Sequence, residues 1–161
     1  MSSLKLQPTR ALRVIPSDNA NIPFPAQVAS GTTTGVLSSR LKDNNGNFLV
    51  KNVAIGDIVY NTTTLAAATV TNVIDATALN LNADIFLVAG NSYVIYQQGG
   101  RTGLGNEGCL LYIGGAGNIS VSTIGDDAIV FEGVLAGTYL PVQIYKVNAT
   151  GTTATLLNAL W

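Results

Sequence analysis

Apolar and polar residues alternate over short stretches along most of this chain of 161 residues, and turn-forming residues separate the stretches. Alternation with a period of two predicts β-strands that bury one face. Turn signals return roughly every eight to twelve residues, a spacing typical of a small β-barrel or β-sandwich. Residues 63–70 (TTLAAATV) are ambiguous, because alanine favours helix whereas threonine and valine favour strand. The pattern therefore predicts an all-β protein with little helix.

The strand pattern divides into two parts at residues 99–108 (GGRTGLGNEG), a stretch with five glycines. Such a sequence cannot pack a core, and it predicts a linker or long loop. Residues 31–98 and 109–161 are then two small antiparallel units, each a β-barrel or β-sandwich. In the second unit, strands are expected at 109–113, 118–124, 128–132, 138–147 and 154–160.

Glycine and proline mark particular positions inside the two units. Asn45-Gly46 predicts a tight hairpin turn. Gly56 and Gly137 each precede a strand, where a turn needs the conformational freedom of glycine. Pro141 stands inside the longest strand-like run, and proline in a strand is tolerated mainly at an edge or a bulge. We therefore expect this strand to lie away from the centre of a sheet.

Residues 1–30 form a leader of different composition. Four prolines, Pro8, Pro16, Pro23 and Pro25, interrupt regular elements and favour extended backbone. The apolar residues between them would not be needed in a disordered tail. We interpret the leader as an extended N-terminal arm that lies across a neighbouring surface or domain; a tail that folds back on its own domain is the alternative. The expected fold is thus all-β, with two small antiparallel units preceded by an extended arm.

The surface implied by the composition is nearly uncharged. Charged residues make up 11% of the chain, apolar residues make up 47%, and the net charge is -1. Little electrostatic repulsion opposes association, so we expect the surface to be covered in an assembly; a monomer is the alternative. The eight lysines and arginines form no basic stripe, so nucleic acid is not an expected partner. No apolar run reaches the roughly 18 residues of a membrane helix and no signal-peptide core is present, which predicts assembly in a cytoplasm.

The composition gives little support for reaction chemistry. The chain has no histidine, and its one cysteine, Cys109, stands in an apolar run where we expect a buried thiol. Residues 103–108 match G-x-G-x-x-G but precede a strand, whereas a dinucleotide site needs a helix there. Residues 43–47 (DNNGN) lack the spacing of a calcium loop. We therefore predict a non-enzymatic protein with no catalytic residue, metal or cofactor.

Three sequence blocks resemble small virion proteins of tailed bacteriophages, including phages of cyanobacterial and marine hosts. They are RVIPSDNANIPFP at 13–25, GDIVYNTTT followed by ADIF and SYVIY, and GTYLPVQIYKVNATGTTATLLNALW at 137–161. The resemblance implies a virion structural protein, with a capsid decoration or cement protein that bridges major capsid proteins as the favoured type. Decoration proteins are frequently trimers, so a homo-oligomer on the capsid surface is implied. Two alternatives remain: a tail, neck or baseplate component, and a surface module that binds a receptor or glycan.

A cement protein acts through buried contacts, which we expect at both ends of the chain. The predicted contact residues are Ile15, Pro16, Ile22, Pro23, Phe24 and Pro25 in the arm, and Tyr139, Leu140, Pro141, Val142 and Trp161 near the C-terminus. Packing inside the chain itself is the alternative for each of them. On the first interpretation, truncation of residues 158–161 weakens folding or assembly. Deletion of residues 1–25 would spare the fold and weaken attachment.

Overall fold

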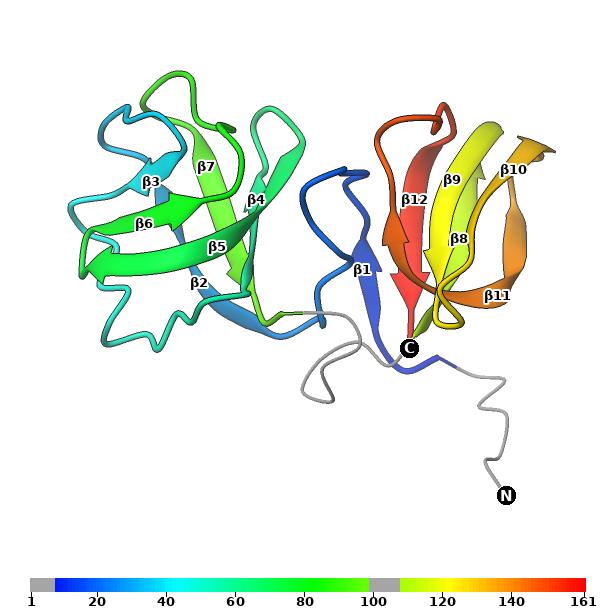
Figure 1. The fold of residues 1–161 in the computed structure, drawn as a ribbon, viewed down its shortest axis with the longest axis horizontal. Helices are drawn as coiled ribbons and strands as arrows, with labels where there is room; N and C mark the ends of the chain where they lie inside the picture. Colours follow the sequence, from blue (N-terminus) through cyan, green and yellow to red (C-terminus); the bar gives the residue numbers. More distant parts are fainter. Residues whose placement is uncertain (1–7, 99–107) are drawn as a thin grey trace.

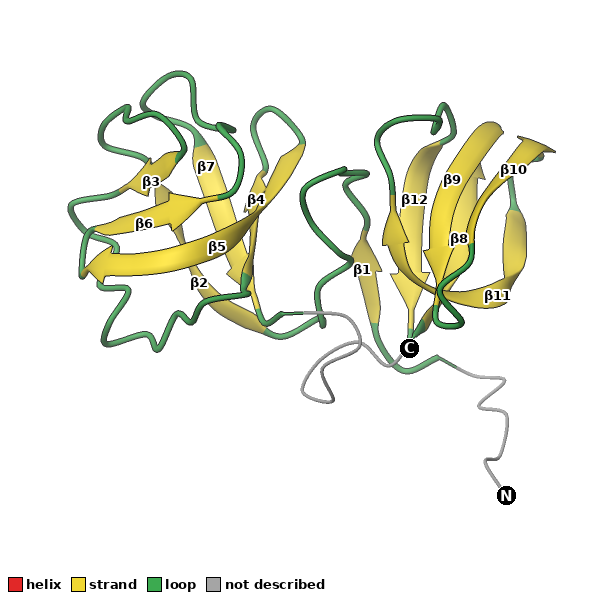
Figure 2. Ribbon diagram, viewed as in Figure 1, coloured by secondary structure: helices red, strands yellow, loops and turns green. Residues whose placement is uncertain are grey.

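The computed structural model describes residues 8–98 and 108–161. In these ranges twelve strands form two antiparallel six-stranded sheets, and no helix is present (Figure 1, Figure 2). The described residues accordingly contain no helix of the length and apolarity that a bilayer span requires. The all-β prediction is confirmed, and residues 66–70 of the ambiguous segment belong to a strand.

The first sheet is built from residues 27–96 and has the spatial order β2-β7-β4-β5-β6-β3. Its strands are β2 (Gln27–Thr32), β3 (Arg40–Lys42), β4 (Ile58–Asn61), β5 (Ala66–Asp75), β6 (Ala78–Leu81) and β7 (Ser92–Tyr96). The sheet curls until a bridge between Gly35 and Lys42 joins the segment after β2 to the opposite edge strand, β3. The enclosed core is centred on the fully buried rings of Phe48, Phe86 and Tyr93.

The two turns predicted in this unit have different outcomes. Gly46 does lie in a turn, since its N–H donates to the carbonyl oxygen of Asp43 at 3.0 Å. The predicted hairpin is wrong, however, because β3 pairs with β6 and not with the next strand, β4. Phe48 comes shortly after this turn, and its ring is buried in the core. The chain from Phe48 onward forms a loop and not the second strand of a hairpin. The turn at Gly56 is confirmed, with a φ of 97°.

The second sheet has the spatial order β1-β12-β8-β11-β9-β10. Its strands are β1 (Ala11–Arg13), β8 (Cys109–Gly115), β9 (Gly117–Thr123), β10 (Ala128–Val134), β11 (Thr138–Val147) and β12 (Thr155–Leu160). All five strands predicted after residue 108 are present, with ends that differ by at most two residues. The core contains Leu111, Ile113 and Leu157, and the Cys109 thiol is buried among them as expected.

Pro141 lies in a central strand, so the expectation that its strand lies away from the sheet centre is wrong. β11 runs between β8 and β9, and its register shifts between Leu140 and Ile144, where pairing with β9 begins. Pro141 falls within that shift, which interrupts the ladder, so its missing N–H costs no regular strand hydrogen bond. The irregularity lets β11 bend from one partner to the other and curl the sheet over its core.

The predicted arm is part of both units within the described residues. Ala11–Arg13 form β1, which pairs with β12, and β2 begins at Gln27, before the boundary predicted at residue 31. Residues 14–26 connect β1 to β2, and Figure 1 shows this connection between the two sheets. The linker predicted at 99–108 lies outside the described residues except for Gly108.

Candidate interaction surfaces

The connection between β1 and β2, residues 14–26, joins the two units through buried side chains; we call it the central loop. Val14 and Ile22 belong to the core of the second sheet. Ile15 and Ala20 pack on the first sheet instead, against Ile58, Tyr60 and Ala67. Neighbouring residues of the loop therefore point into different units, and the loop fills the space between them.

Hydrogen bonds fix the central loop to both sheets. The N–H of Ser17 donates to the carbonyl oxygen of Val147 at 2.9 Å, while its hydroxyl donates to that of Ala67 at 2.9 Å. The carbonyl oxygen of Asn19 accepts from the Thr69 hydroxyl at 2.9 Å and from the Asn82 amide at 2.6 Å. Ser17 thus forms hydrogen bonds with both units, and Asn19 adds two hydrogen bonds to the first unit.

Asp18 adds a charged contact to the second unit. Its carboxylate accepts from the backbone N–H of Thr150 at 3.1 Å and from the Thr150 hydroxyl at 2.8 Å. These donors, the backbone N–H first, hold the pKa of Asp18 below its ordinary value of 3.8. The Lys146 ammonium donates to the carbonyl oxygen of Asp18 at 2.9 Å, which fixes the same turn.

The structure places the six predicted arm residues in contacts within the chain. Ile15, Ile22 and Pro23 are buried, whereas Pro16, Phe24 and Pro25 are half-buried. The Phe24 ring lies 5.3 Å below the guanidinium of Arg10, a cation–π geometry. The interpretation that the arm folds back on its own chain therefore describes these residues, and only the half-buried ones retain surface for a partner.

The five predicted residues near the C-terminus are divided between core and surface. Leu140 is buried, and Val142 and Trp161 are half-buried against the second core. Pro141 is exposed, and Tyr139 is 60% exposed, with its ring 5.3 Å from that of Tyr112. Tyr139 and Tyr112 are register partners on β11 and β8, so the two rings form an aromatic pair on the outer face of the sheet.

An apolar surface that the sequence interpretation missed lies at one end of the first unit. We call it the loop end; its exposed side chains are Val36, Leu37, Leu65, Leu87 and Val88. These residues come from three loops that hydrogen bonds hold together, including Thr33 N–H to Asn91 O and Thr62 N–H to Ser92 O. The sequence did contain a signal for this surface. Val36-Leu37 and Leu87-Val88 are pairs of adjacent apolar residues near turns, and they break the alternation of apolar and polar residues.

A small cleft lies where the loop end approaches the second unit. It has a volume of about 240 Å³, and its lining includes Leu65, Leu156, Ile15, Pro16 and Arg13. Both leucines have left-handed backbone, with φ of 57° and 54°, although leucine rarely adopts it. Both side chains are at least half exposed, so the strain coincides with exposed apolar surface.

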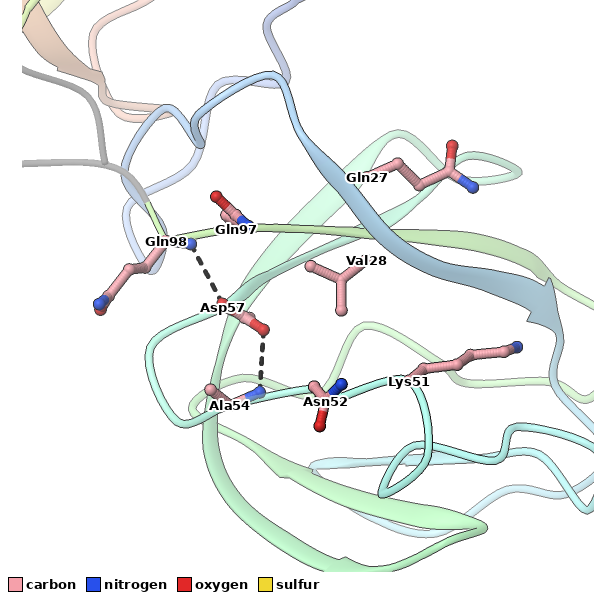
Figure 3. Close-up of a pocket in the computed structure, with 8 residues that line it drawn as sticks. All are labelled: Gln27, Val28, Lys51, Asn52, Ala54, Asp57, Gln97 and Gln98. Atoms are coloured by element: carbon pink, nitrogen blue, oxygen red, sulfur yellow. Dashed lines mark hydrogen bonds between the residues drawn. The ribbon is translucent and has the colours of Figure 1, made fainter. Parts of the chain in front are cut away.

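A wider and more polar pocket of about 540 Å³ lies on the first unit (Figure 3). Amide side chains and one ammonium group line it, from Gln27, Asn52, Gln97, Gln98 and Lys51. Its single carboxylate, Asp57, accepts from the N–H groups of Ala54 and Gln98 at 2.9 and 3.1 Å. Burial raises the pKa of Asp57, and these two hydrogen bonds oppose that shift. The arrangement fixes the turn at Gly56 and provides no second carboxylate for acid–base chemistry.

Asp43, the first residue of the stretch compared with a calcium loop, is buried and bonded inside the first unit. Its carboxylate accepts from the Asn45 N–H at 2.9 Å and from the Tyr93 hydroxyl at 2.7 Å. Across residues 8–98 and 108–161, no three His, Cys, Asp or Glu side chains are grouped so that they could hold a metal ion. The Asp43 carboxylate thus stabilises the turn that contains Asn45 and holds the Tyr93 ring in the core.

Comparison with known proteins adds no relative. The chain matches no protein-family model, no curated protein and no solved structure.

Proposed function

We propose that this protein is a non-enzymatic structural protein of a bacteriophage virion, most specifically a capsid cement protein that bridges major capsid proteins. It is assembled in the host cytoplasm and resides on the capsid surface. Self-association belongs to the proposal; the resemblance to phage virion proteins implies a trimer, whereas the β10 contact inferred below predicts a dimer. The observation that carries the proposal is the loop end, an exposed apolar surface on a scaffold with little charge.

The loop end has the properties of an attachment surface. Leu87 and Val88 are 73% and 57% exposed, and the one charged residue in their loop is Asp84, which is also exposed. Exposed apolar side chains that lie on neighbouring loops mark protein interaction sites, because the free energy falls when they are removed from water. Hydrogen bonds between the loops pre-organise the surface, so little conformational entropy is lost when a partner binds.

The test uses a double variant, Leu87→Ser with Val88→Ser, in heads that lack the wild-type protein. We expect it to fold normally by circular dichroism but to copurify poorly with empty heads and to give them no added heat resistance. The matched control, Val50→Ser with Ile55→Ser, changes two exposed apolar residues in another loop of the same unit. It is expected to bind as the wild type does. Heads whose stability is unaffected by loss of the protein would contradict the cement function.

Copy number separates the capsid from the tail. A cement protein is present in numbers comparable with the major capsid protein, whereas a tail, neck or baseplate component is present in few copies. Quantified protein bands of purified particles measure this ratio. A low ratio would indicate a tail, neck or baseplate component, which is still a structural protein of the virion.

A second candidate function, glycan binding, is favoured by the aromatic pair. Tyr139 is exposed beside Tyr112 on an open sheet face, and aromatic rings of this kind stack on sugar rings. Binding of the purified protein to host envelope polysaccharide, lost on Tyr139→Ala, would support this function. Absence of binding by the wild-type protein would count against it.

A further inference from the structure

Strand β10 leaves one long edge of the second sheet without a partner strand among the described residues. It pairs only with β9, and it stands at the end of the sheet order (Figure 1). Ile129 and Val130 are 46% and 45% exposed, and Ala128 is also exposed. Such an edge is a template for another strand unless charge, proline or distortion protects it.

The other described edges carry more protection. β1 and β3 are three residues long, and each contains a basic residue, Arg13 or Arg40. β2 exposes the polar residues Gln27, Ser30 and Thr32. From Ala128 to Phe131, β10 has neither a charged residue nor a proline, and its pairing with β9 is regular. β10 carries Glu132 and a register shift only after Phe131, so its stretch from Ala128 to Phe131 is the described edge best suited to pairing.

The ladder with β9 shows which backbone groups of β10 point away from the sheet. The N–H of Thr123 donates to the carbonyl oxygen of Asp127 at 2.9 Å. Antiparallel ladders alternate between bonded and non-bonded pairs, so Ile129 and Phe131 bond to β9 like Asp127. The backbone groups of Ala128 and Val130 then point to the open edge, and Glu132 follows in the register shift between Phe131 and Val134.

We infer that β10 pairs with β10 of a second copy of this chain, antiparallel and about a two-fold axis at Val130. In this register Val130 faces itself, Ile129 faces Phe131 of the second copy, and Ala128 faces Glu132 of the second copy. The outward-pointing groups of Val130 then face each other, and those of Ala128 face the start of the register shift at Glu132. The contact is isologous, so it closes as a dimer.

A second copy suits this edge for a reason of charge as well as shape. A two-fold axis nearer the end of the strand would place Glu132 opposite itself, and two carboxylates there would repel each other. The axis at Val130 places each carboxylate beside the small side chain of Ala128. The remaining cross-strand pairs are apolar, which matches the exposed apolar character of Ile129 and Val130.

The first test is the variant Val130→Pro, with mass measured by analytical ultracentrifugation over a concentration series. Proline removes an N–H that faces the open edge, so the ladder with β9 keeps its hydrogen bonds. We expect wild-type protein to dimerise and the variant to be a monomer with an unchanged far-ultraviolet spectrum. A wild-type monomer throughout the series would overturn the inference, as would a trimer, because two-fold pairing closes at two copies.

The second test addresses the register with two substitutions at one exposed position. Ala128→Lys places an ammonium opposite Glu132 of the second copy, twice per dimer, and is expected to lower the dissociation constant by about threefold to tenfold. Ala128→Glu is expected to raise it by a similar factor. If the two substitutions shift dimerisation in the same direction, the proposed register is wrong.

Loss of the β10 dimer and loss of binding to heads can be measured separately. The pair Leu87→Ser and Val88→Ser changes the loop end and leaves β10 intact, so it should alter binding to heads and leave the dimer unchanged. Val130→Pro should remove the dimer whether or not the protein binds heads. Dissociation of the dimer by the loop-end variant would overturn the assignment of the contact to β10.

Discussion

The Asp18 carboxylate and Thr150 are joined by two hydrogen bonds, although they lie 132 residues apart in the chain. The contact ties the central loop to the turn between β11 and β12. It lies beside the bond from the Lys146 ammonium to the carbonyl oxygen of Asp18. The loop that connects the two sheets is therefore also fixed by the far end of the chain.

Acid should weaken this attachment. The pKa of Asp18 in the folded protein lies below 3.8, so its ionised form contributes stability above that pH, and the contribution is lost as pH falls further. Asp75, which accepts two hydrogen bonds from Thr77, has a shift of the same sign. The urea midpoint of the wild type should fall as the pH drops below about 4. We expect a smaller fall for Asp18→Asn, and some fall should remain because Asp75 still titrates. An acid dependence equal to that of the wild type would contradict this role of Asp18.

Deletion of residues 1–25 should destabilise the second unit, contrary to the expectation from sequence. The deletion removes β1 from its pairing with β12 and takes Val14 and Ile22 out of the core. Loss of two buried aliphatic side chains alone should lower the melting temperature by about 10 °C or more. Calorimetry measures the shift.

The strands of the second unit were predictable because each keeps one face in the core. Along β8, Cys109, Leu111 and Ile113 are buried, while Leu110 and Tyr112 are half-buried, which gives a period of two. A local pattern of this kind is visible in sequence without knowledge of the partner strands.

The contacts of the central loop were not predictable, because they depend on which distant elements meet. Val14 and Ile15 are adjacent and equally apolar, yet they pack in different units. The loop end has the same origin, since three loops distant in sequence meet only through the order of the strands. Sequence identified the apolar anchors of the arm but could not distinguish a partner molecule from the rest of the chain.

Leu65 should be a site where glycine is preferred. Its φ of 57° strains the backbone of any residue with a Cβ, and its side chain is half exposed. Leu65→Gly relieves the backbone strain. Leu65→Ala removes the same apolar surface but keeps a Cβ, and therefore keeps the strain. We expect the glycine variant to be about 1 kcal/mol more stable than the alanine variant by urea unfolding. Equal stabilities would show that the backbone at this position stores no strain.

Gly31 should be intolerant of a side chain because of the buried contact beneath it. A Cβ there would lie 2.6 Å from Oδ2 of Asp43 and 2.7 Å from the Tyr93 hydroxyl, the two atoms of a 2.7 Å hydrogen bond. Gly31→Ala must separate them, which leaves the Tyr93 hydroxyl and Oδ2 of Asp43 buried without this hydrogen bond, while Oδ1 keeps its bond to the Asn45 N–H. We expect a loss of about 2–3 kcal/mol in the free energy of unfolding.

Gly35→Ala is the matched control for this substitution, in the segment that follows β2. Its Cβ would meet only the flexible Lys42 side chain, at 3.4 Å, so a change within about 0.5 kcal/mol is expected. Tyr93→Phe removes the hydroxyl that Gly31→Ala displaces. If the displaced hydrogen bond is the cause, the double variant loses less stability than the sum of the single variants. Additive losses would assign the cost of Gly31→Ala to backbone displacement instead.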